Sequence, residues 1–484
     1  MTAAKIERAT FVRRVAGQGV LMLAGFGGAQ VLGFLRNIFL AHLLSKGDFG
    51  TAAALTIALQ TFELISDVAV DRMVLQSADC DDQRTIATGH TVLLARAALM
   101  SFVLWAAAPW FAWLFGLFDA TLAFRAVALI PLLKGFMHLD CRIAQRQLDN
   151  RAAVLVEIIP QALALATVWP AVILTRDYTA ALWVTGVQAV ATSAVSHGLA
   201  RTRYQLGFDV QLLTRFARFG WPILLGAIPM LAVFQGERAM VARYLGAEAL
   251  AGYTVAFLIT MVPATLASRV GLSLMLPLLA DPAATTARRD ERFTLMFELS
   301  VLAASLYLVG FLTLGGQVVR LAFGHNYDGY GAATGALALM WALRLVQASF
   351  GAFLMSTGDN RPLLIAGLVR ACALVPAFFA AHAGMSLATL GLCGASGELA
   401  QILYFAWWLR GGYPALSGMV LSRTAFIALA VAMTAPFWIG PWAGLSLWAT
   451  SGLAGLVALF VIASAAAVLP STRGELQVLR AAAA

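Results

Sequence analysis

The sequence has few charged residues and no long polar stretch. Only 12% of its 484 residues are charged, and 61% are hydrophobic. A soluble domain is about half apolar and about a quarter charged, so this composition indicates a polytopic membrane protein. The net charge of +9 does not indicate nucleic-acid binding, because the Lys and Arg residues form no run with interleaved aromatics. They lie mostly in the turns between apolar segments.

Cysteine is scarce, and the common enzyme motifs are absent. The four cysteines show no CxxC or metal-ligand spacing and are interpreted as small packing residues. The sequence contains no Walker motif, no dinucleotide-binding fingerprint after a strand, no HExxH and no GxSxG. We therefore predict that the protein is not an enzyme and has no catalytic residue, metal site or cofactor. Coupling to a proton or sodium gradient is left open.

Apolar segments of membrane-spanning length dominate the chain. About 20 apolar residues span a bilayer, and the first such stretch is too long for a signal peptide, so we interpret it as a retained helix. The pattern predicts an all-α protein with about fourteen transmembrane helices. The expected segments are 15–43, 50–76, 89–115, 121–141, 152–174, 179–200, 216–242, 250–280, 294–322, 331–357, 362–383, 386–409, 419–439 and 444–469.

The basic residues predict the orientation of these segments. The N-terminus, the loop at 140–151 and the loop at 201–215 are rich in Arg and fall on one side of the predicted topology. Loops on the other side, such as "FGHNYDGY" at 323–330, hold few basic residues. Because cytoplasmic loops carry the excess of Lys and Arg, we expect a multi-pass membrane protein with both termini cytoplasmic. The resemblance described below implies that this membrane is the bacterial inner membrane.

Two stretches suggest an internal repeat. "LAHLLSKGDFGTAAAL" at 40–55 and "VARYLGAEALAGYTVAF" at 241–257 each join a charge-bearing segment through a short turn to a Gly and an apolar run. The copies are six segments apart and so share one orientation, which favours two parallel bundles with a substrate site between them. We predict a six-helix lobe at 1–201, a second at 202–411, and two extra helices with a cytoplasmic tail at 412–484.

Three acidic residues share one face of the second segment. Glu63, Asp67 and Asp71 are four residues apart, a spacing that places them on one helix face. They are candidates for coupling to a proton or a cation, because carboxylates within a membrane protein commonly mark such pathways. The alternative is a structural stripe packed against the basic stripe of the fourth segment, which includes Lys134. Function and structure are both open for Lys134, while Arg142 is interpreted as an anchor at the membrane boundary.

Arginine dominates the charges that lie deep in other segments. Arg36, Arg238, Arg269 and Arg344 are candidates for binding an anionic, phosphorylated substrate, because the guanidinium fork matches phosphate oxygens. The alternative is that each is a structural ion-pair partner. Glu237 precedes Arg238, and neighbouring helical residues point about 100° apart, so we expect each to find a partner elsewhere, and Glu237 is a further coupling candidate. Other deep charges are Arg370, Glu298 and Glu398.

Three motifs resemble those of bacterial oligosaccharide flippases, the polysaccharide-biosynthesis transporters of the multidrug/oligosaccharidyl-lipid/polysaccharide exporter superfamily. The stretch at 40–76 is similar to the end of their first helix and all of their second, although Ala69 replaces a glycine. "RFARFGWPILLGAIPM" at 215–230 is similar to the start of their seventh helix. "ERAMVARYLGAEALAGYTVAF" at 237–257 is similar to the stretch that follows, with Glu237 in place of the usual Asp.

The resemblance implies a flippase for undecaprenyl-pyrophosphate-linked oligosaccharide in O-antigen, capsule or exopolysaccharide synthesis. Two six-helix lobes would enclose a cationic cavity, with membrane lipid around them and a polymerase and other assembly proteins as partners. The alternatives are a lipid II flippase or a cation-coupled multidrug exporter of the same superfamily. A membrane-embedded glycan polymerase or ligase is a different class, and the absence of a long extramembrane loop argues against it.

Overall fold

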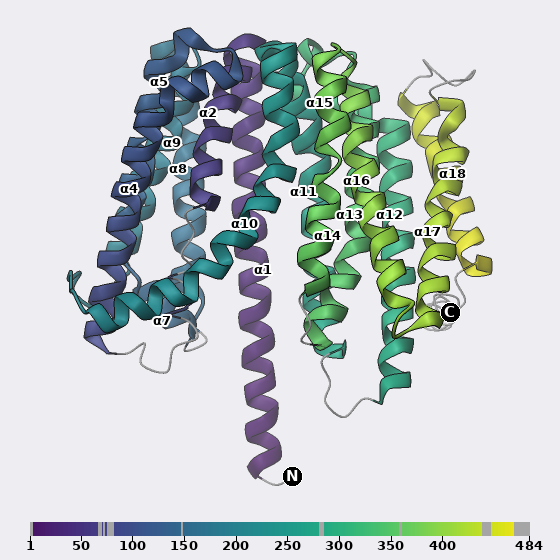
Figure 1. Cartoon of the computed structure of the whole chain (residues 1–484), viewed down its shortest axis with the longest axis horizontal. Helices are drawn as coiled ribbons and strands as arrows, with labels where there is room; N and C mark the ends of the chain where they lie inside the picture. Colours follow the sequence, from purple (N-terminus) through teal and green to yellow (C-terminus); the bar gives the residue numbers. More distant parts are fainter. Residues whose placement is uncertain are drawn as a thin grey trace. The chain divides into compact units, whose positions relative to one another are not determined.

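The structure is a computed structural model, and it describes residues 3–65, 70, 73–74, 82–146, 149–279, 285–357, 361–437 and 447–468. Every regular element in these ranges is a helix (Figure 1). The first half of the chain forms α1 (Ala3–Leu43), α2 (Lys46–Ile65), α4 (Gln83–Phe115), η1 (Phe118–Ala120), α5 (Thr121–Val127), α6 (Leu129–Gly135), α7 (Asp140–Arg146), α8 (Arg151–Thr175) and α9 (Thr179–Gly198). The second half forms α10 (Val210–Leu245), α11 (Ala247–Leu279), α12 (Thr286–Phe323), η2 (His325–Tyr327), α13 (Gly331–Thr357), α14 (Arg361–Ala371), α15 (Leu374–His382), α16 (Leu387–Leu409), α17 (Pro414–Thr434), η3 (Ala435–Phe437) and α18 (Leu447–Val468).

The lengths and composition of the helices confirm an all-α, multi-pass membrane protein. Within the described ranges, eight helices are long and apolar enough to cross a membrane, or nine if one bent pair counts as a span. The expected total of fourteen stays a prediction.

Helix α16 ends at Leu409, and α17 starts with Pro414 in its first turn. A proline is well placed there, because the first turn of a helix needs no amide donor.

The chain divides into two compact units. Unit 1 comprises residues 1–231 and 245–251, and unit 2 comprises residues 232–244 and 252–484. This division passes through helix α10, whereas the sequence analysis placed a lobe boundary between residues 201 and 202. The expected lobes at 1–201, 202–411 and 412–484 therefore stay a prediction.

Unit 1 is a bundle of helices in which neighbours in the chain, and helices farther apart in the chain, pack against one another. Helix α8 packs on α9 and on α1, and α4 packs on α5 and α6 (Figure 1). Helix α2 approaches the start of α11 closely at Gly50, where an added Cβ would collide with the backbone carbonyl of Ala247. Glycine is therefore required at this point of contact.

The predicted segment 121–141 is not one helix, which corrects the sequence analysis. Helices α5 and α6 run to Gly135, and the chain bends by 53° before α7 begins. The bend frees backbone amides, and side chains satisfy them. Ser196 Oγ accepts from the His138 N–H at 2.9 Å, and His90 Nε2 accepts from the Leu139 N–H at 3.2 Å. A break at membrane depth is tolerated only where protein groups replace the lost helical hydrogen bonds.

Polar contacts fasten the α9–α10 loop to the rest of unit 1. The Asp140 carboxylate accepts hydrogen bonds from the Arg201 N–H at 2.7 Å, from the Thr202 N–H at 2.8 Å and from Thr202 Oγ1 at 2.8 Å. Further along the loop, the Gly207 N–H donates to the Ala87 carbonyl at 3.1 Å. The loop is thereby held against α4 and α7.

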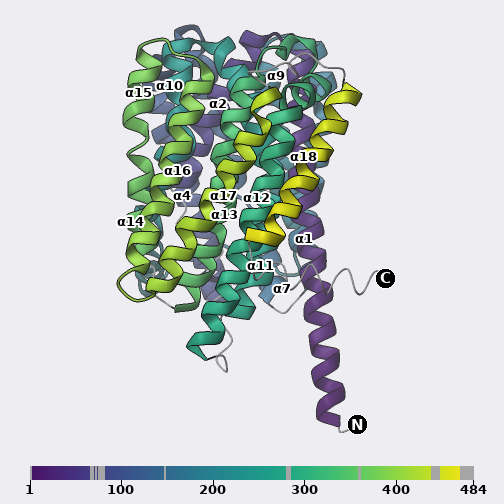
Figure 2. The same ribbon diagram turned by 90° about the vertical axis from the view of Figure 1, so that its right-hand side faces the viewer.

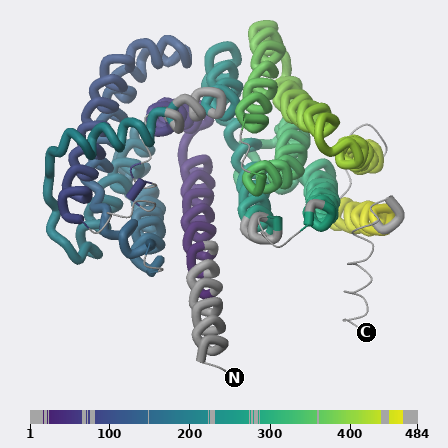
Figure 3. The backbone as a smooth tube through the Cα atoms, turned by 60° about the horizontal axis from the view of Figure 1, so that its bottom comes forward, coloured from purple at the N-terminus to yellow at the C-terminus, as the bar shows by residue number. Residues whose placement is uncertain are grey.

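Unit 2 is built around α12 and α13. Helix α13 packs against α12 and α16, and α12 also contacts α17 and α18 (Figures 2 and 3). The predicted segment 362–383 consists of α14 and α15, with a break at Cys372 and Ala373. Pro376 explains the break, because it cannot donate a backbone hydrogen bond to the preceding turn.

Candidate functional site

An ion pair joins the acidic face of α2 to α6 in unit 1. Lys134 Nζ lies 2.6 Å from Glu63 Oε1, and about a third of each side chain is exposed, 33% and 32%. The geometry agrees with the expectation that Glu63 points to a basic side chain. Asp67 and Asp71, the other members of the acidic stripe, lie outside the described residues. Coupling roles for the three carboxylates and Lys134 stay predictions.

The same ion pair lines a cavity of about 280 Å³ in unit 1. Arg96 from α4 and Arg142 from α7 also line this cavity, with Thr192 from α9. The described lining thus carries three cationic side chains and one carboxylate. The sequence analysis did not select Arg96, although a lone basic residue within the apolar segment 89–115 was a usable signal. Arg142, which was interpreted from the sequence as an anchor at the membrane boundary, also lines this cavity.

Arg36, a candidate for substrate binding, lies in α1 of unit 1. Its Nη1 donates to Gln188 Oε1 on α9 at 2.5 Å. Gln188 is one helical turn from Thr192, whose hydroxyl donates to the Gln188 backbone carbonyl at 2.8 Å. Helix α9 therefore contacts Arg36 through Gln188 and, one turn later, lines the charged cavity with Thr192.

A second group of charges lies in the interior of unit 2. Glu398 Oε1 accepts from Arg344 Nε at 2.8 Å and from Arg344 Nη2, and Arg370 Nη1 lies 3.6 Å away. The guanidinium of Arg344 also lies over the rings of Trp341 and Phe234, at 4.4 Å and 4.6 Å from their centroids. Only 12% of the Arg344 side chain and 1% of the Glu398 side chain are exposed. This geometry is that of a closed ion pair and favours the structural alternative for Arg344.

Glu237 and Arg238 contact different partners, as the angular step between neighbouring helical residues predicts. The Tyr253 hydroxyl donates to Glu237 Oε2 at 2.6 Å. Arg238 lies over the Phe257 ring at 5.3 Å from its centroid and donates to Gln235 on its own helix at 3.2 Å. Both charged side chains are buried. The described contacts of Glu237 include no salt bridge, so it stays a candidate for titration.

Gly394 positions the Glu237 carboxylate. A Cβ at this position would lie 2.5 Å from Glu237 Oε1 and 2.9 Å from Met340 Sδ. Both atoms belong to buried side chains. A larger residue at this position would therefore displace the Glu237 carboxylate from its present place. Helix α16 thus contributes the carboxylate of Glu398 and, one turn earlier, the space that Glu237 occupies.

Two deep charges selected from the sequence, Arg269 and Glu298, lie in other parts of unit 2. Arg269 on α11 is exposed, and no hydrogen bond or ion pair is described for its side chain. Glu298 on α12 is fully buried and pairs with Arg423 on α17, with 3.1 Å between Arg423 Nε and Glu298 Oε1. Of the four arginines proposed for substrate binding, Arg36 belongs to unit 1 and the other three to unit 2.

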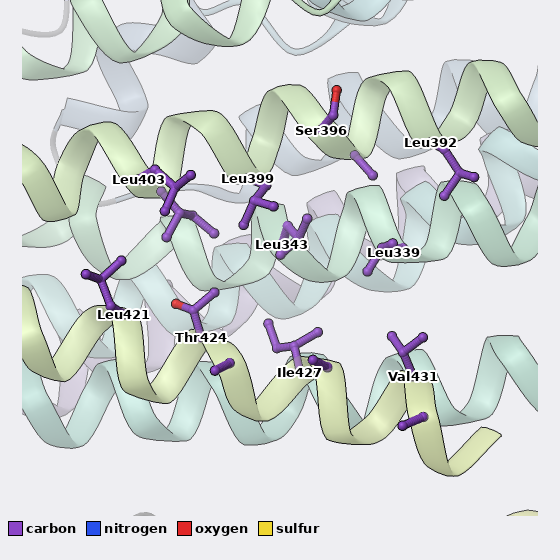
Figure 4. Close-up of a pocket in the computed structure, with 15 residues that line it drawn as sticks. Leu339, Leu343, Leu392, Ser396, Leu399, Leu403, Leu421, Thr424, Ile427 and Val431 are labelled. Atoms are coloured by element: carbon purple, nitrogen blue, oxygen red, sulfur yellow. The ribbon is translucent and has the colours of Figure 1, made fainter. Parts of the chain in front are cut away.

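Two cavities in unit 2 are apolar. The larger, of about 580 Å³, lies among α13, α16 and α17, and aliphatic side chains dominate its wall (Figure 4). A smaller one of about 330 Å³ shares Leu339, Leu392 and Val431 with it. The described residues that line them include no charged side chain, so neither cavity is suited to an anion.

Comparison with solved structures identifies the class of fold. The chain is similar to the lipid II flippase MurJ in an inward closed conformation, with a TM-score of 0.67, 10% identity, and coverage of 91% of this chain and 97% of that one. It is also similar to an inward-facing multidrug resistance MATE family transporter of the MOP superfamily, with a TM-score of 0.61, 14% identity, and coverage of 81% and 95%. The fold is therefore that of MOP superfamily transporters.

The family follows from the sequence comparison. Residues 39–331 match the family described as polysaccharide biosynthesis protein, and the chain belongs to this family. It is 21% identical over 422 residues to the succinoglycan biosynthesis transport protein ExoT of Rhizobium meliloti, covering 86% of this chain and 84% of that protein. The resemblance noted in the sequence is confirmed. Family and fold together support a transport role and not an enzymatic one.

Proposed function

We propose that the protein is a flippase that moves an undecaprenyl-pyrophosphate-linked oligosaccharide across the bacterial inner membrane. The family match over residues 39–331 carries this proposal, because it places a chain with a transporter fold in polysaccharide synthesis. The product would be O-antigen, capsule or exopolysaccharide. A polymerase and other assembly proteins would act on the translocated substrate.

The deep charges support transport of an anion. Charged side chains within the apolar helices are costly and usually serve a pathway or a pair. All four substrate-binding candidates from the sequence are arginines, which suits a pyrophosphate better than a cationic drug. Arg36, Arg238 and Arg269 are the substrate-binding candidates that no described carboxylate neutralises in the contacts given above. Arg344 keeps this role only if Glu398 releases it.

Coupling to an ion gradient is the second part of the proposal. Glu237 is buried and accepts a hydrogen bond from the Tyr253 hydroxyl, so a change in its protonation would change the charge of the unit 2 cluster. Glu63, Asp67 and Asp71 are the corresponding candidates in unit 1, with Lys134 as the partner of Glu63. The driving ion would be a proton or sodium.

The orientation in the membrane is also a proposal. Both termini would be cytoplasmic, and the loop at 323–330 would be periplasmic, because the basic loops lie on the side of the termini. Reporter fusions at Asn326 and after Ala484 should report opposite sides. Fusions reporting the same side would contradict this topology.

A genetic complementation experiment tests the function. Deletion of the gene should abolish the surface or secreted polymer and leave lipid-linked oligosaccharide in the membrane, and the intact gene should restore the polymer. Hydrogen bonds to charged groups contribute about 1.5–3 kcal/mol each, and about 1.4 kcal/mol is a factor of ten. Arg238→Ala should therefore reduce polymer output by about tenfold or more, and Arg238→Lys by less. Normal polymer and no accumulated intermediate in the deletion strain would refute the proposal.

A further inference from the structure

We infer that the charged cavity of unit 1 is a diphosphate-binding site, in which Glu63 occupies Lys134 until a phosphate group replaces it. The inference rests on the proposed function for the identity of the ligand as a lipid-linked diphosphate. It assigns the binding to Arg96, Lys134 and Arg142, a different set from the arginines that the sequence selected.

The composition of the cavity wall carries the inference. Three helices, α4, α6 and α7, each direct one cationic side chain to a single space of about 280 Å³. Two of the three are arginines, whose planar fork binds phosphate oxygens through paired hydrogen bonds, and the lysine adds a point charge. The two apolar cavities of unit 2 offer no such groups in their described walls.

The other residues in the wall narrow the class of ligand. Val70, Leu93, Ala97, Met100 and Pro131 line the cavity with hydrocarbon. Thr192 supplies the one neutral hydroxyl among the described lining residues. A sugar needs many neutral hydrogen-bonding partners, whereas a diphosphate needs a concentration of positive charge. The wall therefore suits the diphosphate and not the glycan that follows it.

The Glu63–Lys134 pair is suited to exchange of partners. Both side chains are about a third exposed and line the cavity, so an incoming anion can reach Lys134. An ion pair that contacts solvent contributes little net stability, and a diphosphate carries more negative charge than one carboxylate. The Glu298–Arg423 pair has a different character, because Glu298 is fully buried and neither residue lines this cavity.

Exchange at Lys134 makes Glu63 a competitor of the ligand. A phosphate that binds Lys134 must displace the Glu63 carboxylate from the lysine. Removal of this carboxylate should therefore strengthen diphosphate binding.

Direct binding to the purified full-length protein tests the site. The probes are inorganic pyrophosphate and farnesyl diphosphate, a short isoprenoid diphosphate, with farnesol as the uncharged comparison, measured by isothermal titration calorimetry in detergent. We expect both diphosphates to bind and farnesol not to bind. Arg96→Gln, Lys134→Gln and Arg142→Gln should each weaken diphosphate binding by about tenfold, and Glu63→Gln should strengthen it severalfold.

Matched controls separate a binding defect from a folding defect. Arg423→Gln breaks an ion pair outside the cavity and should leave diphosphate affinity unchanged. Arg96→Lys and Arg142→Lys keep the charge and should retain part of the affinity, and each variant should elute as one sharp peak on size exclusion.

The outcomes distinguish this inference from the proposed function. A protein that restores polymer in the deletion strain but binds no diphosphate, or binds it equally well in all three glutamine variants, overturns the cavity as the site. Weaker binding in Glu63→Gln overturns the exchange of partners. Specific diphosphate binding in a protein whose deletion leaves the polymer normal overturns the proposed function and leaves the site intact.

Discussion

Replacing Glu398 with Gln should destabilise unit 2 more than any replacement of its arginine partners. Glu398 is the one described carboxylate within ion-pair distance of both Arg344 and Arg370. Glutamine keeps the size of the side chain and removes its charge. The change removes the described carboxylate that lies within ion-pair distance of both buried guanidinium groups.

The contacts predict a graded order of effects. Breaking a buried ion pair by removing one partner costs about 3–5 kcal/mol, because the other charge stays buried. Glu398→Gln should fall in this range, since 1% of the carboxylate side chain is exposed and water cannot compensate. Arg344→Gln should cost less, because Arg370 remains next to Glu398. Arg370→Gln should cost least, since its contact at 3.6 Å is the longest of the set.

Thermal unfolding of the purified variants in detergent measures this order, together with the amount of each protein in the membrane. The double variant Glu398→Gln with Arg344→Gln closes a mutant cycle and should be less destabilised than the sum of the single changes. A midpoint for Glu398→Gln equal to that of the wild type would refute the reasoning. Arg370→Gln as the most damaging variant would show that the longer contact dominates the cluster.

Two further predictions concern the packing of unit 1. Gly50→Ala should strongly reduce the yield of folded protein, because its Cβ would collide with the Ala247 carbonyl. In Gly47→Ala the nearest atom lies 4.0 Å from the added Cβ, and alanine favours a helix more than glycine does, so the yield should not fall. Fluorescence-detected size exclusion compares the two, and equal yields would contradict the predicted collision. Asp140→Ala removes a carboxylate that accepts three hydrogen bonds from the loop at 199–209, so hydrogen exchange in that loop should rise by about tenfold or more. Unchanged protection would show that the other contacts of the loop are sufficient.

The sequence predicted helices well because apolar length and charge are local properties. The fold class and the separate environments of Glu237 and Arg238 follow from the composition and from the helical period, and the structure agrees with both. The spacing of the acidic and basic stripes also anticipated that Glu63 would meet a basic residue. The helices and the angular positions of the charges depend on residues within one or two helical turns, whereas the contact between Glu63 and Lys134 spans 71 positions and was anticipated from the complementary charge of the two stripes.

Partners across long sequence separations could not be predicted in the same way. Arg36 bonds to Gln188, and Arg344 to Glu398, across 152 and 54 positions. Helical periodicity shows which face carries a charge, but it does not show which helix packs against that face. The break before α7 was missed for a related reason, because Ser196 and His90, which satisfy its amides, lie in other helices.

The contrast between the two units shows why a buried arginine alone is weak evidence for a substrate site. Arg344 is more deeply buried than Lys134 and bonds a carboxylate with two of its nitrogens, so an incoming anion would have to break that contact first. Lys134 pairs with one carboxylate at the wall of a cavity, where solvent already reaches both partners. A charge can recognise a ligand only if exchanging its partner costs little, and this requires an open cavity beside it. By this criterion Lys134 is better placed for an anion than Arg344.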